Sequence, residues 1–374
     1  MNIWLHTPFK PLNHPLPSGD LTTAQGIRDF LERKGHRVRP VGQPRTRWIY
    51  WSPHLWPSAF AQWRHVRRQL TAAPPDLWLT YHSYYKAPDL IGPEVARRYG
   101  IPYALFQGMY STKHRRKMKT WPGFVLNRRA LVAAGHLFAN KRVDQQNLQR
   151  IVSPARITYI RPGIDPSGFS RDAGAGRCWR DRWHAEDRPV VVTAAMFRPD
   201  VKTQGLAWMI RTLGALRERG ADFILAIAGD GSQRQRLERL AQAHLPGRVR
   251  FAGRIPRSEM YAFYSAGDVF AFPGINEALG MVYLEAQCCG LPVVAFDNAG
   301  TPEVILRDRT GFLVSFQDGP GFVGAVERLL SDADLRREMG RAAARYVRSR
   351  HDLNANYGVM ERMLGEMVGG NLDK

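Results

Sequence analysis

The chain has 374 residues, which is more than a single domain usually holds, so two domains are expected. Apolar residues make up 44% of it, which suffices for ordinary cores and excludes a disordered protein. The formal net charge is +21, and residues 1–190 carry 31 Lys and Arg against 12 Asp and Glu, whereas residues 191–374 carry 23 against 21. The basic half therefore predicts an anionic partner, with nucleic acid, a phosphorylated substrate and an anionic membrane as alternatives.

The three cysteines are too few for a disulfide framework. Cys288 and Cys289 are adjacent in an apolar stretch, which favours a reduced packing role over chemistry. The segment Met1–Thr7 turns polar too early for a signal peptide, and no apolar run approaches the roughly 18 residues of a membrane span. These features predict a cytoplasmic protein.

Strand-like and helix-like segments alternate along the whole chain, which predicts two parallel sheets with crossover helices. Residues 166–188 are rich in Gly, Arg and Asp and are read as a linker region. The predicted organisation is an N-terminal Rossmann-like domain at 1–166, a linker at 167–189, a C-terminal Rossmann-like domain at 190–350, and a helix at 351–374 that packs back on the first domain. The expected strands are residues 3–5, 37–41, 77–81, 103–106, 190–195, 223–228, 249–252, 269–272, 293–296 and 312–314, and helical spacing is seen at 22–34, 87–99, 334–350 and 354–367.

The most informative stretch is Phe272–Phe296. A strand leads into a loop that carries Glu277, and a helix then opens near Gly280, the position where open α/β sheets bind ligands. Amides at Gly280, Met281 and Val282 would face an anion at this helix N-terminus, and a glycine lets the backbone approach it closely.

Two carboxylates lie in this stretch, although carboxylates repel an anion. Glu277 in the loop could accept hydrogen bonds from sugar hydroxyls, and Glu285 in the helix could accept two from a ribose diol. The alternative is that Glu277 is an ordinary loop residue and Glu285 an exposed helix position.

The spacing of Glu277 and Glu285 resembles the Glu-x7-Glu element of the retaining glycosyltransferase family four, whose members have the GT-B fold. This resemblance implies two Rossmann-like domains facing an interdomain cleft, the first binding acceptor and the second binding donor. Further segments resemble the family: Arg161–Asp165 with Phe169, Ala228–Gly231, Val249–Gly253, Gly300–Glu303 and Gly311–Val314.

The resemblance implies a set of donor contacts. Glu285 would hold the donor ribose, Glu277 the transferred sugar, and the amides of Gly280, Met281 and Val282 the diphosphate. Gly253 and Arg254 would lie beside the donor.

Lys202 resembles the family's diphosphate-binding lysine. The family has a Gly-Arg pair shortly before it, whereas this chain has Met196-Phe197 there and an arginine at Arg198. Either Arg198 reaches the phosphates from a shifted loop, or Lys202 acts with less help.

Cleavage of a sugar–diphosphate bond builds charge on the leaving group. The sequence offers no group of His and carboxylates at ligand spacing, so we expect neither a metal nor another cofactor. Lys202, Arg198 and a helix N-terminus can stabilise that charge instead.

The first half offers weaker signals. Gly19, in Pro17-Ser-Gly-Asp20, resembles the family's glycine loop near the donor phosphates, and the alternative is a plain turn with Asp20 as helix N-cap. Gln107 stands where the family commonly carries a histidine, and a glutamine cannot act as acid or base. His82 and Asp20 are the other candidate acceptor contacts.

Two stretches, residues 60–70 and 109–131, interleave Lys and Arg with aromatic residues. This pattern suits peripheral contact with an anionic membrane, and the alternative is a solvated basic face. No recognised nucleic-acid motif is present.

The sequence thus predicts a metal-independent retaining glycosyltransferase. It would move a sugar from a UDP- or GDP-sugar to a glycan or lipid-linked acceptor in cell-envelope polysaccharide or glycolipid synthesis. Two alternatives remain: a non-transferring sugar-nucleotide enzyme of the same fold, such as an epimerase, and a basic nucleic-acid-binding protein with a degenerate transferase fold.

Overall fold

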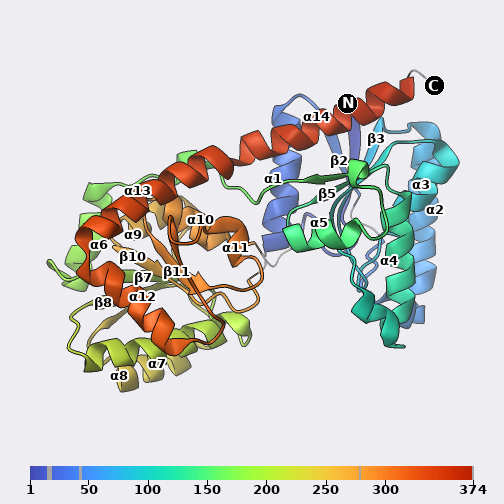
Figure 1. The fold of residues 1–374 in the computed structure, drawn as a ribbon. Coiled ribbons are helices and arrows are strands. Elements are labelled where there is room, and N and C mark those ends of the chain that lie inside the picture. Colours follow the sequence, from blue (N-terminus) through green and yellow to red (C-terminus); the bar gives the residue numbers. More distant parts are fainter. Residues whose placement is uncertain (15–18, 42–43, 278, 373–374) are drawn as a thin grey trace. The chain divides into compact units, whose positions relative to one another are not determined.

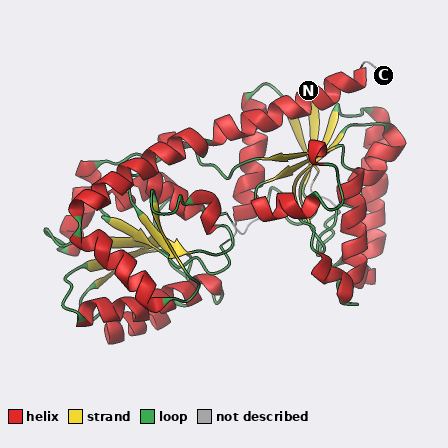
Figure 2. Ribbon diagram, in the orientation of Figure 1, coloured by secondary structure: helices red, strands yellow, loops and turns green. Residues whose placement is uncertain are grey.

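The computed structural model describes residues 1–14, 19–41, 44–277 and 279–372. The chain divides into two compact units (Figure 1). Unit 1 consists of Met1–Ile160 together with Asn354–Lys374, and unit 2 consists of Arg161–Leu353. Figure 2 shows that each unit holds its own sheet with helices on both faces.

Unit 1 is built on a six-stranded parallel sheet in the order β2-β1-β3-β4-β5-β6. The order reverses between β1 and β3, so the crossovers leave toward both edges of the sheet from this point. Its strands are β1 (Asn2–His6), β2 (Arg37–Val41), β3 (Leu77–Ser83), β4 (Tyr103–Gly108), β5 (His136–Ala139) and β6 (Ile157–Tyr159). Its helices are α1 (Gly19–Arg33), α2 (Trp56–Ala72), α3 (Gly92–Tyr99), α4 (Trp121–Ala133), α5 (Arg142–Leu148) and α14 (Leu353–Leu372).

Helices cover both faces of this sheet, and strands β3 and β4 are therefore buried along their whole length. On one face, apolar residues of α2, α3 and α4 pack against the strands around Trp4, Trp78 and Tyr103. On the other face, Tyr357 of α14 contacts Phe30 of α1 and Phe106 of β4, with ring centroids 5.7 and 6.2 Å apart. The C-terminal helix therefore completes the core of unit 1.

Unit 2 repeats this architecture with the strand order β12-β11-β10-β7-β8-β9, which reverses between β7 and β10. Its strands are β7 (Val190–Ala194), β8 (Ile224–Ala228), β9 (Val249–Gly253), β10 (Val269–Ala271), β11 (Val293–Phe296) and β12 (Gly311–Val314). Its helices are α6 (Ala173–Trp183), α7 (Val201–Glu218), α8 (Arg234–His244), α9 (Met260–Ser265), α10 (Met281–Cys288), α11 (Thr301–Val304), α12 (Gly319–Ser331) and α13 (Ala333–Arg350).

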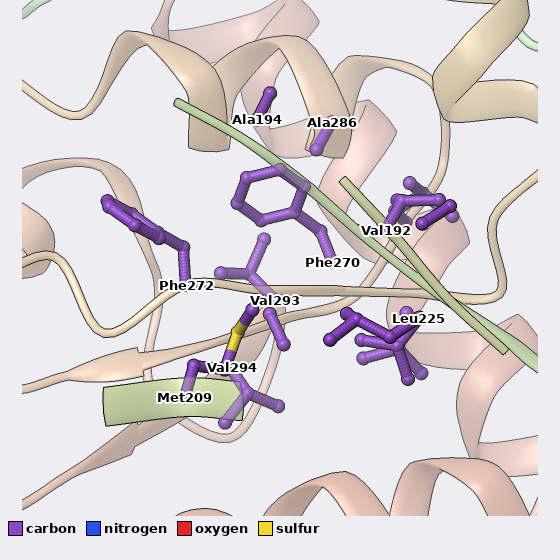
Figure 3. Close-up of a cluster of buried hydrophobic side chains, with 14 of the residues drawn as sticks. Val192, Ala194, Met209, Leu225, Phe270, Phe272, Ala286, Val293 and Val294 are labelled. Carbon is purple, nitrogen blue, oxygen red and sulfur yellow. The ribbon is translucent and has the colours of Figure 1, made fainter. Parts of the chain in front are cut away.

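The core of unit 2 is a continuous apolar cluster around the central strands. Figure 3 shows Val192, Phe270 and Val294 of adjacent strands packed with Met209 of α7 and Ala286 of α10. These side chains are buried almost completely, so helices α7 and α10 are held firmly against the sheet. Both helices begin at the end of a strand that flanks the reversal, and this places their N-termini where a ligand would lie.

The two units, each Rossmann-like, confirm the predicted GT-B fold class, but the predicted linker at 167–189 is wrong. Residues Ala173–Trp183 form helix α6, which Asp172 caps by accepting a hydrogen bond from the Ala175 amide at 2.9 Å. Trp183 is buried and packs edge-on against Phe263 of α9. The segment is polar overall, but its tryptophans anchor it to unit 2.

The predicted first residue of helix α3 is also wrong. Helical spacing was expected from Ala87, whereas α3 begins at Gly92. The buried carboxylate of Asp89 accepts hydrogen bonds from the amides of Ile91 and Gly92, at 2.8 and 2.9 Å, so residues 87–91 form a capped loop.

Candidate functional site

The candidate donor site in unit 2 lies where the strand order reverses. Strands β7 and β10 are parallel neighbours, and their carboxyl ends lead into the loops before α7 and α10. Open α/β sheets bind ligands in the crevice outside the carboxyl ends of two such strands. Lys202 and Glu277 follow these two strands, so the fold itself brings together residues 75 positions apart.

Lys202 and Glu277 form an ion pair between Nζ and Oε2. The backbone fixes Lys202 near the start of α7, because its amide donates to the Asp200 carboxylate that caps the helix, at 2.8 Å. The ammonium also lies over the ring of Phe272, 5.7 Å from the centroid. The Glu277 side chain is only 12% exposed, so this carboxylate is held largely out of water.

Gly280 is the N-cap residue of α10 and has the left-handed conformation, with φ 64°. A Cβ at this position would lie 2.7 Å from Val304 Cγ2 and 2.9 Å from the Tyr283 ring, so only glycine fits. The amide of Tyr283 donates to the Gly280 carbonyl, at 3.0 Å. Met281 and Val282 are half-buried in the first turn of α10, where backbone amides lack intrahelical acceptors. Ala278, in the loop that leads to this turn, lies outside the described residues.

Glu285 is buried within α10, with 8% of the residue exposed, which contradicts the alternative of an exposed helix position. Its Oε2 accepts a hydrogen bond from the Tyr264 hydroxyl at 3.1 Å, and its Oε1 lies 3.1 Å from the Arg257 guanidinium. Burial raises the pKa of the Glu285 carboxyl, while Arg257 and Tyr264 act in the opposite direction. The carboxylate is thus held in one orientation, with Arg257 itself half-exposed beside it.

Arg198 lies exposed in the loop between β7 and α7. Its carbonyl accepts hydrogen bonds from the Thr203 hydroxyl and the Asp200 amide, which fix the loop's backbone. Phe197, its neighbour, is fully buried, and the Phe197 amide donates to the Asp230 carbonyl at 3.0 Å. Arg198 therefore lies in a loop whose backbone is fixed by hydrogen bonds, four positions before Lys202.

Gly253 ends β9 with φ 73°, and its carbonyl accepts from the Gly229 amide at 2.7 Å. Gly229 has φ 136°, and a Cβ there would lie 1.8 Å from the Ala195 carbonyl oxygen, so the Gly229 turn packs directly on the β7 loop. Arg254, which follows Gly253, is exposed at the end of the same strand.

In unit 1 the predicted acceptor residues also gather at the reversal of strand order. His82 near the end of β3 and Asp20 in the first turn of α1 lie 3.1 Å apart between Nδ1 and Oδ1. Burial raises the pKa of the Asp20 carboxyl, but the His82 hydrogen bond and charge, with Lys141 and Lys10, outweigh it and lower that pKa overall. Gly19 is the first residue of α1, and a Cβ there would meet no atom within 4 Å. Pro17 and Ser18 of the predicted glycine loop lie outside the described residues.

His82 and Gln107 share an unusual backbone conformation at the ends of neighbouring strands. Both have φ 61°, in the left-handed region that non-glycine residues rarely adopt. Gln107 is 5% exposed, and its Oε1 accepts from Asn140 at 3.3 Å. Such conformations occur in turns and at functional sites, where the surrounding structure enforces them.

Sequence reasoning missed the residues that hold the predicted ones in place. Tyr264 and Arg257 orient Glu285, and Phe272 lies against Lys202. No local signal could have found the first two, because they lie more than 20 positions before Glu285. Phe272 was recognised only as the end of a strand.

Two general features bear on what the site can hold. Among the described residues no group of three or more His, Cys, Asp or Glu side chains is arranged to bind a metal ion. Within the same part of the chain, every helix is too short or too polar to cross a membrane.

The fold is that of GT-B glycosyltransferases. Sucrose-phosphate synthase from Thermosynechococcus elongatus superposes with a TM-score of 0.76, at 18% identity, over 97% of this chain and 99% of that one. Anabaena Alr3699/HepE in complex with UDP also gives 0.76 at 18% identity, over 98% and 100% of the two chains.

Residues 179–346, which make up most of unit 2, match the family described as glycosyl transferases group 1. A GDP-mannose-dependent alpha-(1-6)-phosphatidylinositol monomannoside mannosyltransferase from Mycolicibacterium smegmatis is 38% identical over 205 residues, 53% of this chain and 51% of that protein. The chain thus spans about half the length of this relative. A D-inositol 3-phosphate glycosyltransferase from Pseudarthrobacter chlorophenolicus is 27% identical over 84% of this chain and 78% of its own length. These matches support the glycosyltransferase resemblance.

Proposed function

We propose that the protein is a retaining glycosyltransferase that moves a sugar from a nucleotide diphosphate sugar to an acceptor. The observation that carries this proposal is the ion pair between Lys202 and Glu277 beside the N-terminus of α10. It joins a cation and a carboxylate at the position where an open α/β sheet binds ligands.

The ion pair matches the chemistry of the donor. In a nucleotide diphosphate sugar the anomeric carbon is bonded directly to the terminal phosphate, so an anion and a polyhydroxylated ring lie side by side. Lys202 and the first amides of α10 suit the phosphate, and Glu277 suits the hydroxyls of the sugar. Glu285, buried and oriented by Tyr264, suits the ribose diol.

In the transfer step, the acceptor hydroxyl oxygen forms a bond to the anomeric carbon while the bond from that carbon to the diphosphate oxygen breaks. The electron pair of the broken bond stays on the diphosphate, and the hydroxyl proton passes to a phosphate oxygen. Lys202, the α10 amides and Arg198 stabilise this growing negative charge, so no metal ion is required. The acceptor oxygen is then bonded to the anomeric carbon on the face from which the diphosphate leaves, so the sugar retains its configuration.

We place the binding of the acceptor in unit 1. His82 with Asp20, and Gln107 on the next strand, offer hydrogen-bonding groups at the reversal of that sheet. The mycobacterial relative is named as a GDP-mannose-dependent enzyme that acts on a phosphatidylinositol monomannoside. The relative from Pseudarthrobacter is named as a glycosyltransferase that acts on D-inositol 3-phosphate. By analogy, we place this chain in the transfer of a UDP- or GDP-sugar to a glycan or lipid-linked acceptor of the cell envelope, on the cytoplasmic side.

Peripheral membrane contact is part of the same proposal. The basic surface, defined as residues 60–70 and 109–131, exposes large apolar side chains among its cations: Phe60 is 60% exposed, Met118 91% and Trp121 53%. Exposed apolar side chains flanked by Lys and Arg bind anionic interfaces through insertion and charge together.

A panel of nucleotide sugars, tested for thermal stabilisation in the presence of EDTA, examines this proposal. A ligand that binds only the folded chain raises its melting temperature, so the true donor and its nucleoside diphosphate should both do so without metal. Stabilisation that appears only after magnesium is added would contradict metal independence. If no nucleotide sugar stabilises the chain under either condition, the donor assignment fails.

A further inference from the structure

A second candidate site lies in unit 1, at the same edge of the sheet as His82. An open surface depression of about 580 Å³ is lined by Trp48, Trp51 and Lys119, and we call it the Trp48 pocket. Trp48 and Trp51 follow β2 and Lys119 follows β4, so the pocket lies beyond the carboxyl ends of the strands, where α/β sheets bind ligands.

The walls of the Trp48 pocket are fixed by backbone contacts. Trp48 has the left-handed conformation with φ 57°, held by a hydrogen bond of 2.7 Å from its amide to the Lys86 carbonyl. The Trp51 indole donates to the Lys119 carbonyl, also at 2.7 Å, although the side chain is 54% exposed. A bulky residue in this conformation is strained, and the pocket is therefore kept in shape at a cost in stability.

A row of aromatic rings connects His82 to this pocket. His82 stacks on Tyr84 with centroids 4.8 Å apart, Tyr84 contacts Tyr85 at 5.7 Å, and Tyr85 contacts Trp48 at 5.9 Å. Beyond Trp48 the row continues through Tyr50 to Trp51, with centroids 5.8 and 6.1 Å apart. The contacts from Tyr84 to Trp51 are edge-on, and His114 covers one face of Tyr85, with centroids 3.6 Å apart. Trp51, at the end of the row, is 54% exposed and can offer an apolar ring face to the C–H face of a sugar.

Positive charge accompanies the row. The Lys119 and Lys86 ammonium groups lie 5.9 and 5.8 Å from the Trp48 ring centroid. The sequence has no Asp or Glu between Glu32 and Asp76, nor between Glu94 and Asp144, so both stretches that form the pocket carry only cations. Burial lowers the pKa of His114, which stacks on Tyr85, and the charges of Lys113, Lys86 and Lys117 lower it further.

We infer that the Trp48 pocket binds the distal part of an acidic oligosaccharide acceptor, whose sugars extend along the aromatic row from His82 and whose anionic group pairs with Lys119 and Lys86. The inference rests on the proposed function, because it assumes that His82 marks the acceptor's reacting end. It specifies what the proposed function leaves open, namely an acceptor longer than one sugar that carries negative charge away from the reacting hydroxyl.

Binding of oligosaccharides to the full chain tests this inference. The probes are acidic oligosaccharides bearing uronate, phosphate or sulfate groups, and neutral oligosaccharides of the same length. Titration calorimetry measures the binding affinity of each probe. We expect at least one acidic probe to bind more tightly than its neutral counterpart. Trp51→Ala should weaken both by about tenfold, equivalent to about 1.4 kcal/mol, because stacking does not require charge. Lys119→Gln should weaken only the acidic probe, by about fivefold.

Matched controls are available. Phe316→Ala removes an aromatic ring that is 52% exposed, close to the 54% of Trp51, but lies in unit 2. Lys34→Gln removes an ammonium 5.9 Å from the Phe30 ring, the same spacing as Lys119 from Trp48. Both controls should bind all probes as the unaltered chain does.

Stabilisation by the donor, measured in parallel on every variant, separates this inference from the proposed function. If donors stabilise all variants but no acidic probe binds preferentially, or Trp51→Ala and Lys119→Gln match their controls, the acceptor inference is overturned and the donor assignment stands. If the two variants instead lose binding to anionic phospholipid vesicles while oligosaccharide binding is unchanged, the pocket serves a membrane and the inference is again overturned. If no donor stabilises the unaltered chain, the proposed function fails first.

Discussion

Lys202 near the start of α7 and Glu277 in the loop after β10 meet as an ion pair across the reversal of strand order in unit 2. The side chains of Lys202 and Glu277 are 30% and 12% exposed, so both charged groups are partly shielded from water. The predictions below follow from this arrangement and from the groups around it.

Lys202→Ala should lower kcat by about 100-fold or more while the donor KM changes less. The charge that Lys202 meets grows as the sugar–phosphate bond breaks, so its contribution is largest in the transition state. Lys202→Arg should recover part of the rate.

Steady-state kinetics on Arg198→Ala then tests the arginine that departs from the family pattern. A silent Arg198→Ala beside an inactive Lys202→Ala would remove Arg198 from the mechanism.

Glu285→Ala should weaken binding of the free nucleoside diphosphate by about 1.5–3 kcal/mol, the range for a hydrogen bond to a charged group. Calorimetric titration measures this directly. Glu259→Ala, at an exposed position before α9, is the control and should have no effect. Tyr264→Phe should have a smaller effect than Glu285→Ala, because Arg257 still orients the carboxylate. Equal affinity in Glu285→Ala and the unaltered chain would exclude the ribose assignment.

His351 should make unit 2 sensitive to acid. It is fully buried, its Nδ1 lies 2.6 Å from the Pro162 carbonyl, and burial lowers its pKa to about 4. The folded state therefore binds fewer protons than the unfolded state between about pH 6.5 and 4, so stability is full above this window and is lost as the pH falls through it. The loss amounts to about 3 kcal/mol, because a shift of one pKa unit corresponds to about 1.4 kcal/mol. His351→Gln should flatten this part of the profile of melting temperature against pH, and an unchanged slope would contradict the assignment.

The basic surface should bind anionic vesicles. Replacing Arg115, Arg116 and Lys117 with Gln should release the chain, since each cation near such a surface contributes about 1 kcal/mol and is screened by salt. Trp121→Ala should weaken binding even at high salt, because the ring inserts through apolar contact. Equal binding to neutral and anionic vesicles would remove the electrostatic part of the proposal, and tighter binding to DNA or RNA would favour the nucleic-acid alternative.

The sequence predicted the class of fold because its strands are short, apolar and regularly spaced. Residues 37–41 and 293–296 coincide with β2 and β11. Strands β5 and β6 were missed, since they have only four and three residues and β5 begins with a histidine. The helix α6 was missed because its segment is polar and contains glycines. The groups that anchor it lie far away in sequence: Trp183 packs on Phe263, and Arg180 pairs with Asp268.

The candidate site was predictable as a set of residues but not as an arrangement. The motif around Gly280 and Glu285 is local, and strand, turn and helix follow one another as expected. The pairing of Lys202 with Glu277 and of Asp20 with His82 joins residues distant in sequence, and only the strand order brings them together. The partners of Glu285 and the aromatic row from His82 to Trp51 depend on tertiary packing that no sequence pattern specifies.

The central claim is transfer of a sugar from a nucleotide diphosphate sugar through the site that contains Lys202 and Glu277. Its most direct test is mass spectrometry and NMR of the products formed from a panel of UDP- and GDP-sugars with an acceptor mixture. We predict one nucleoside diphosphate released per sugar transferred, retention of the anomeric configuration in the product, and loss of both products in the Lys202→Ala and Glu277→Gln variants. Conversion of the nucleotide sugar to an epimer without transfer, or equal product formation by these variants and the unaltered chain, would contradict the account.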